Sequence, residues 1–214
     1  MFVLTEIVLQ RAIKDGIRAI QNDISIVDEI FVQMLHPKLN YLYGQKYVDG
    51  IKTWLESEKI RVIQPWSFDT TKVPAITIHL GSEVDDENKA SIGDFYGIDD
   101  GTEILVNPMT VSLDIGIHAD KSKDYVLWLY YMVNYILYKE KRNFRDLGLQ
   151  LVTFNASDYN KESKYMAENI WTRWIRFRCT VQNYVGGDNG ILIEDIDSDV
   201  YVSRQNDNNP IYIP

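Results

Sequence analysis

Histidines and carboxylates are the side chains in this sequence that could do metal or acid–base chemistry. His79 and His118 each lie in a segment where apolar and polar residues alternate, on the polar side of a predicted strand. If these strands are neighbours, the two imidazoles could share one surface and bind a metal ion together with Asp114. Such a site needs a third positioned ligand, and a histidine on a strand usually faces solvent or an interface. We therefore predict no metal ion and no other cofactor.

An acidic repeat near the end of the sequence imitates a calcium loop. Asp195, Asp197 and Asp199 alternate like the acids that open such a loop. Val200 stands where the loop needs glycine for its turn, and Asn206 where it needs a bidentate glutamate. The repeat therefore favours an exposed acidic strand, whose charges discourage indiscriminate pairing at a sheet edge.

The stretch from Gly81 to Gly101 is rich in glycine and carboxylates. Two-metal nucleases also use several carboxylates, but they hold them rigidly a few ångströms apart. A glycine-rich polar stretch indicates a long loop or an exposed hairpin instead, and excursions of this kind commonly carry contacts. Asp94, Phe95 and Tyr96 are our candidate contact residues within it.

Basic and aromatic residues gather in the last strongly alternating segment: Trp171, Arg173, Trp174, Arg176 and Arg178. Single-stranded nucleic acid can stack on such aromatic side chains, with the backbone held by arginine. The net charge of the chain is −9, which opposes general attraction to nucleic acid. Tryptophan and arginine are also enriched where proteins bind one another. We interpret these five residues as a protein–protein contact surface.

Common catalytic signatures are absent from the sequence. It contains no GxGxxG, GxxxxGK[ST], HExxH, GxSxG or CxxC motif, so the usual phosphate-binding, zinc-protease and nucleophile-elbow sites lack their residues. The single cysteine, Cys179, excludes an intramolecular disulfide. It alternates with Ile175, Phe177 and Val181, which indicates a buried structural thiol. We predict that the protein is not an enzyme.

Bulk composition is that of an ordinary globular protein. The 214 residues are 45% hydrophobic and 25% charged, enough for one domain with its own core. The longest apolar stretch, Tyr125 to Tyr138, is too short and too polar to span a bilayer. The first ten residues lack the basic region of a signal peptide, so we expect synthesis in the cytoplasm.

Hydrophobic periodicity predicts an α+β fold. Helices are expected over 3–21 and 47–59, and a long helix begins at a cap formed by Asp120 or Ser122. The segment 24–31 fits either a further helix or an extended passage. Strands are predicted over 60–64, 76–80, 109–118, 149–155 and 172–184. We expect an antiparallel or mixed sheet of about four to six strands, with the N-terminal helix and the long helix packed on one face.

Composition changes after Val185. Residues 186–190 form a glycine-rich joint, and short apolar patches follow among acids and asparagines. We divide the chain into an α+β domain, 1–185, and an extended C-terminal arm, 186–214. The arm has too little apolar mass for a core of its own, and it is suited to add to its own body or to a neighbour's. Its candidate contact residues are Ile191, Ile193, Ile211, Tyr212 and Ile213.

The order of these segments resembles the tail-terminator, or tail-completion, proteins of long-tailed bacteriophages. The resemblance is carried by the amphipathic helix LTEIVLQRAIKDGIRAI, the strand VPAITIHLGSE after a proline, and the strand and capped helix TVSLDIGIHADKSKDYVLWLYYMVNYIL. LGLQLVTF and the closing strand WTRWIRFRCTVQNYV complete it, over roughly four-fifths of the chain. It is a likeness of order and pattern without an invariant motif. The stretch 36–71 and the C-terminal arm depart from it.

The resemblance implies a structural virion protein of the tail or neck. Such a subunit forms a ring with its own copies, commonly a hexamer, that caps the tail tube and connects it to the head. Its partners would be tail-tube, sheath or head-connector proteins, and nucleic acid only as DNA passing through the ring. Another neck or baseplate subunit is the alternative, and a metal-dependent enzyme or a nucleic-acid-binding module fits the residues less well.

Overall fold

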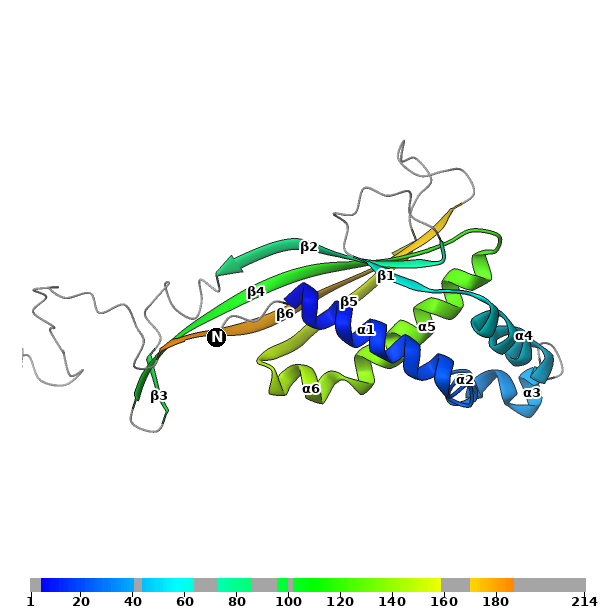
Figure 1. Ribbon diagram of the computed structural model, residues 1–214, viewed down its shortest axis with the longest axis horizontal. Helices are drawn as coiled ribbons and strands as arrows, with labels where there is room; N and C mark the ends of the chain where they lie inside the picture. Colours follow the sequence, from blue (N-terminus) through cyan, green and yellow to red (C-terminus); the bar gives the residue numbers. More distant parts are fainter. Residues whose placement is uncertain are drawn as a thin grey trace, which may run out of the picture.

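A computed structural model describes residues 5–40, 44–63, 73–85, 96–99, 102–158 and 170–186. Helices lie on one side of a curved sheet (Figure 1). The helices are α1 (Thr5–Asn22), α2 (Ile26–Ile30), the 3₁₀ helix η1 (Val32–Leu35), α3 (Pro37–Asn40), α4 (Gly44–Ser57), α5 (Lys123–Lys139) and α6 (Lys141–Asp146). The strands are β1 (Arg61–Ile63), β2 (Ala75–Asp85), β3 (Tyr96–Asp99), β4 (Thr102–Ala119), β5 (Leu149–Asp158) and β6 (Trp171–Gly186).

The described sheet is mixed and has six strands. Its order is β1-β2-β4-β6-β5, with β3 paired to the far end of β4. β1 runs parallel to β2, whereas the other pairs are antiparallel. The predicted α+β class, with a mixed sheet and two main helices on one face, is confirmed. The predicted joint begins at Gly186, which ends β6. The rest of the joint and the predicted arm, residues 187–214, lie outside the described residues.

α1 and α5 pack together beneath the sheet, and each buries an apolar face in the core (Figure 1). On α1, the predicted apolar stripe Leu9, Ile13, Ile17 and Ile20 is buried, as the helical period of 3.6 residues requires. The two helices approach closely at Gly16, where an added Cβ would lie 2.6 Å from Cγ1 of Ile136. On α5, the predicted face is buried at Val126, Leu129, Val133, Ile136 and Leu137, whereas Tyr130 is half-buried.

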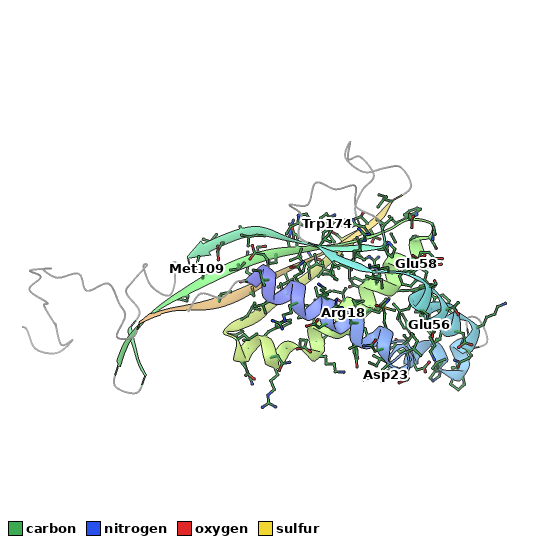
Figure 2. All side chains as sticks on the ribbon, in the orientation of Figure 1. Arg18, Asp23, Glu56, Glu58, Met109 and Trp174 are labelled. Carbon is green, nitrogen blue, oxygen red and sulfur yellow. The ribbon has the colours of Figure 1, made fainter. Side chains whose placement is uncertain are left out.

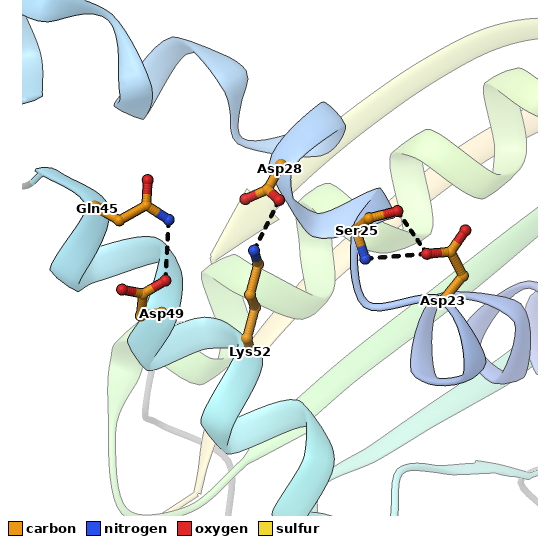
Figure 3. A network of polar contacts seen from close by, with 6 residues as sticks. All are labelled: Asp23, Ser25, Asp28, Gln45, Asp49 and Lys52. Carbon is orange, nitrogen blue, oxygen red and sulfur yellow. Dashed lines mark hydrogen bonds and ion pairs between the residues drawn. The ribbon is translucent and has the colours of Figure 1, made fainter.

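The segment after α1 proves to be helical, which decides the alternative left open by its sequence. Asp23 accepts hydrogen bonds from the backbone amide and the hydroxyl of Ser25, which starts the turn into α2 (Figure 3). Lys52 of α4 then reaches Asp28 of α2 with an Nζ to Oδ2 distance of 2.7 Å (Figure 3). α2 is therefore held by a charged contact as well as by the buried side chain of Val27.

Turn residues bound α5 and α6. The Ser122 hydroxyl accepts a hydrogen bond from the amide of Asp124 and caps α5. Gly148 follows α6 with a φ of 80°, a conformation that glycine adopts without steric cost. Among the described helices, none is long and apolar enough to cross a membrane.

The sheet extends farther than the helices that cover it. β2, β4 and β6 run past the helical layer toward the β3 hairpin, and Met109 marks the region where β4 leaves it (Figures 1 and 2). Leu80 shares a face with Ile76 and Ile78, yet it is 43% exposed because it lies near the limit of the helical cover. The predicted excursion 81–101 is in part strand, since β2 continues to Asp85 and β3 spans 96–99.

Candidate interaction surface on the open face of the sheet

We call the side of the sheet away from the helices the open face. Trp174 marks it in Figure 2, where its side chain lies across the sheet from α1. Alternate residues of β4 and β6 point to this side, because successive side chains of a strand point to opposite faces. Pairing aligns Gly116 with Trp174, Asp114 with Arg176 and Ser112 with Arg178. The sequence-predicted Trp174, Arg176 and Arg178 therefore form one row along β6.

The other two members of the predicted tryptophan–arginine group lie elsewhere. Arg173 points to the helix-covered side, where its guanidinium lies 4.8 Å from the centre of the Tyr130 ring. It also donates two hydrogen bonds to Asp158, of 2.6 and 3.1 Å. These hydrogen bonds lower the pKa of the Asp158 carboxyl. Trp171 begins β6 and is 38% exposed, so the five predicted residues do not form one surface.

Several predicted contact residues cannot be placed on this surface. Tyr96 begins β3, and nothing further is described of its side chain. Outside the described residues lie Asp94, Phe95, Ile191, Ile193, Ile211, Tyr212 and Ile213.

A hydrogen-bonded cluster joins three strands at the inner end of the open face. The Thr77 hydroxyl lies 2.9 Å from Nε2 of His118 and 3.0 Å from Nε2 of His79. Nδ1 of His118 lies 3.0 Å from the hydroxyl of Thr172. The Trp174 ring packs edge-on against both imidazoles, with centroid distances of 5.1 Å to His79 and 5.7 Å to His118. We call these five residues the histidine–tryptophan cluster.

Burial sets the charge state of the two histidines. His118 is only 6% exposed, and desolvation lowers its pKa to about 4, with a further contribution from the nearby His79. Desolvation also lowers the pKa of His79, against an opposing attraction to Asp114. Both imidazoles are therefore neutral at physiological pH. The sequence places both histidines on the polar side of their strands, but it does not predict that His118 is buried.

Gly116 makes room for the histidine–tryptophan cluster. A Cβ at this position would lie 2.5 Å from Oγ1 of Thr77, 2.6 Å from Nε2 of His118 and 2.9 Å from Cζ3 of Trp174. Real Cβ atoms essentially never approach other atoms so closely. The sequence signal for this close approach is a glycine within a strongly alternating strand.

The surface that could have held a metal ion is organised differently. Both Nε2 atoms lie within hydrogen-bond distance of the Thr77 hydroxyl oxygen. Asp114 is bound by Arg176, with hydrogen bonds of 2.7 and 3.1 Å to its two oxygens. Within the described ranges, no group of three or more histidine, cysteine, aspartate or glutamate side chains is arranged to hold a metal ion.

Farther along β4 and β6 the open face carries two arginines and several hydroxyl side chains. The side chain of Arg176 is 71% exposed despite its bond to Asp114, and that hydrogen bond raises the pKa of its guanidinium. Arg178 is exposed as well. Ser112 lies beside Arg178, and Thr110 lies beside Thr180 in the next row. This part of the surface offers donors in a regular array.

Cys179 lies on the opposite, helix-covered side of β6. It is fully buried, and its thiol lies 3.6 Å from the carbonyl oxygen of Val111. Burial raises the pKa of the thiol to about 12, so almost none is present as the reactive thiolate at neutral pH. The predicted buried thiol is confirmed.

Comparison with known proteins gives no relative for this chain. Neither the known protein-family models nor the curated proteins contain a match to it. The open face is therefore interpreted from its own geometry.

Proposed function

We propose that this protein is a structural virion subunit that assembles into a ring and terminates a bacteriophage tail tube, connecting it to the head or neck. The observation that carries the proposal is the unequal treatment of the two faces of the sheet. Helices cover one face of the sheet over part of its length. The other face presents Trp174, Arg176 and Arg178 in a row along β6. Large aromatic and arginine side chains of this kind dominate binding at protein interfaces.

The chemistry of the open face supports contact rather than catalysis. Asp114 accepts hydrogen bonds from Arg176, and His79 and His118 each lie within hydrogen-bond distance of the Thr77 hydroxyl. A catalytic acid or base must instead reach a substrate proton. β2, β4 and β6 extend past the helices that cover the sheet, and their uncovered parts add further surface for neighbouring subunits (Figure 1). The resemblance to tail terminators, which rests on the order of the segments in the sequence, supports the same proposal.

A different neck or baseplate subunit is the second candidate within the same class. It would use the same two-faced sheet and the same extended strands, so these features do not distinguish a subunit at the head–tail junction from one elsewhere in the neck or baseplate. Immunogold labelling of an intact particle separates them, because a terminator labels the junction of head and tail. Label at the distal end of the tail would replace the terminator by a baseplate subunit.

Assembly itself is tested on the purified full chain. Native mass spectrometry over a range of concentrations should show one closed oligomer, and negative-stain images should show a ring. Arg176→Glu should weaken the oligomer, because it places a second negative charge beside Asp114 and reverses the charge at the centre of the Trp174–Arg176–Arg178 row. Arg142→Glu is the matched control, since Arg142 is 84% exposed on α6 and also faces an aspartate. A chain that stays monomeric at high concentration would refute the proposed function.

A further inference from the structure

The outer part of the open face is rich in donors, with its carboxylate already bound. Among the described side chains of β4 and β6, Asp114 is the only carboxylate, and Arg176 binds both of its oxygens. Arg178 lies two residues farther along β6, on the same face and exposed. Alternate residues of a strand repeat every ~6.8 Å. The backbone positions of Arg176 and Arg178 therefore have that spacing, and we call the two side chains the Arg176–Arg178 ladder.

The chain carries a segment with the complementary pattern. Between Gly187 and Pro214, six acidic residues stand against one arginine. Three of the acids, Asp195, Asp197 and Asp199, alternate, so an extended segment would present them on one side with the same ~6.8 Å repeat. Carboxylate and guanidinium form strong charge-assisted hydrogen bonds when they meet in this way.

We infer that residues 194–199 of one copy bind the Arg176–Arg178 ladder on the open face of a neighbouring copy. This rests on the proposed function, because a ring is what brings a neighbour to the open face. Carboxylates at every second residue would face guanidinium groups at every second residue, with Ser112 and Thr180 as flanking hydroxyls. Asp195, Asp197 and Asp199, which do not match a calcium loop, thereby contribute to recognition between copies.

The neighbouring copy is the occupant to which the geometry points. β6 runs away from its own Arg178 for eight further residues, about 27 Å at the rise of a strand, before Gly186 ends it. Gly186 therefore lies far from the Arg176–Arg178 ladder of its own copy. For residues 194–199 to bind the ladder of their own copy, the chain would have to reverse direction completely after Gly186 and return along β6.

Cysteine pairing between two differently substituted full-length chains tests the inference. Chains with Ser112→Cys are mixed with chains carrying Asp195→Cys, which shares the side of Asp197 and Asp199 in an extended segment, and oxidation is followed on non-reducing gels. We expect a disulfide-linked dimer of the two variants. The native Cys179 does not compete, because it is buried and its thiol is almost fully protonated. Thr53→Cys, exposed on α4, replaces Ser112→Cys in the control mixture and should give no dimer.

Charge exchange supplies the second arm of the experiment. Arg178→Asp in the Ser112→Cys chain should lower the dimer yield by about tenfold or more, because like charges then face each other. Asp197→Arg with Asp199→Arg in the other chain should restore it. A disulfide that forms only when both cysteines are in one chain would overturn the inference, and so would no disulfide at all. A ring that still forms in that case retains the proposed function and rejects the inference alone.

Discussion

The two faces of β4 solve different physical problems with the same alternating strand. On the helix-covered face, Val111, Leu113, Ile115 and Ile117 are all completely buried, and their contribution to stability is loss of apolar surface from water. On the open face, His118 is buried as well, but it is held by hydroxyl groups on two other strands. The helix-covered face is therefore held by apolar packing, whereas His118 on the open face is held by matched hydrogen-bonding groups.

The largest effect should come from removing volume on the helix-covered face. Ile115→Ala should lower the free energy of unfolding by about 3 to 4 kcal/mol, because it leaves a cavity at a fully buried position. Ser112→Ala, on the other side of the same strand, is the matched control and should change stability by less than about 0.5 kcal/mol. Urea titrations of both variants measure the difference. Equal losses would mean that the faces do not differ as described.

Acid should act mainly through the open face. The pKa of His118 falls from its ordinary 6.5 to about 4 on folding. Between these values the unfolded chain binds the proton that the folded chain excludes, so stability falls as the pH drops through this window. The loss should reach about 3 kcal/mol at pH 4, at 1.36 kcal/mol for each pKa unit.

His118→Gln separates this titration from that of the carboxylates. Glutamine does not titrate, so the variant should lose less stability than the unsubstituted chain between pH 6.5 and 4, whatever its stability at pH 7. Thermal unfolding at half-unit pH steps provides the comparison. Identical slopes for the two proteins would exclude His118 as the source, and His79, less buried, would then be the histidine to substitute.

Close packing of the histidine–tryptophan cluster predicts a smaller but specific effect at Gly116. Gly116→Ala should destabilise the fold by about 2 kcal/mol, as overpacking typically does, because the new methyl group meets Thr77, His118 and Trp174. Gly50→Ala is the control. Nothing lies within 4 Å of a Cβ there, in the middle of α4, so stability should rise by up to about 1 kcal/mol. Opposite signs in chemical denaturation would confirm that the open face is packed at this point.

The sequence predicts the helix-covered face well because that face is encoded locally. Alternation identifies β4 and β6, and a period of 3.6 residues identifies the buried stripe of α1. A short polar sequence likewise predicts a cap at Asp120 or Ser122, and Ser122 is the residue that forms it. Each of these signals lies within one element, so it survives without knowledge of the neighbours.

The open face was harder to predict because it depends on pairing between strands. The position of Arg173 on the opposite side from Arg176 follows from parity, but its partners Asp158 and Tyr130 come from other elements. The burial of His118 depends on Thr77 and Trp174, which pairing brings from β2 and β6. Leu80 shows the same limit for apolar residues, since its exposure depends on where the helical layer ends.

The smallest predicted effect concerns how firmly the helical cover is held. Ser122→Ala removes the hydroxyl that accepts from the amide of Asp124 and should lower the free energy of unfolding by about 1 kcal/mol, the usual contribution of an N-cap. Ser122→Asp should restore most of it, because aspartate caps equally well and its charge is favourable at a helix N-terminus. Hydrogen exchange should report faster exchange in the first turn of α5 for the alanine variant alone, with the amides of β6 unchanged. If β6 also exchanges faster, opening of the cover exposes the sheet, and the two faces are coupled more tightly than their separate chemistry suggests.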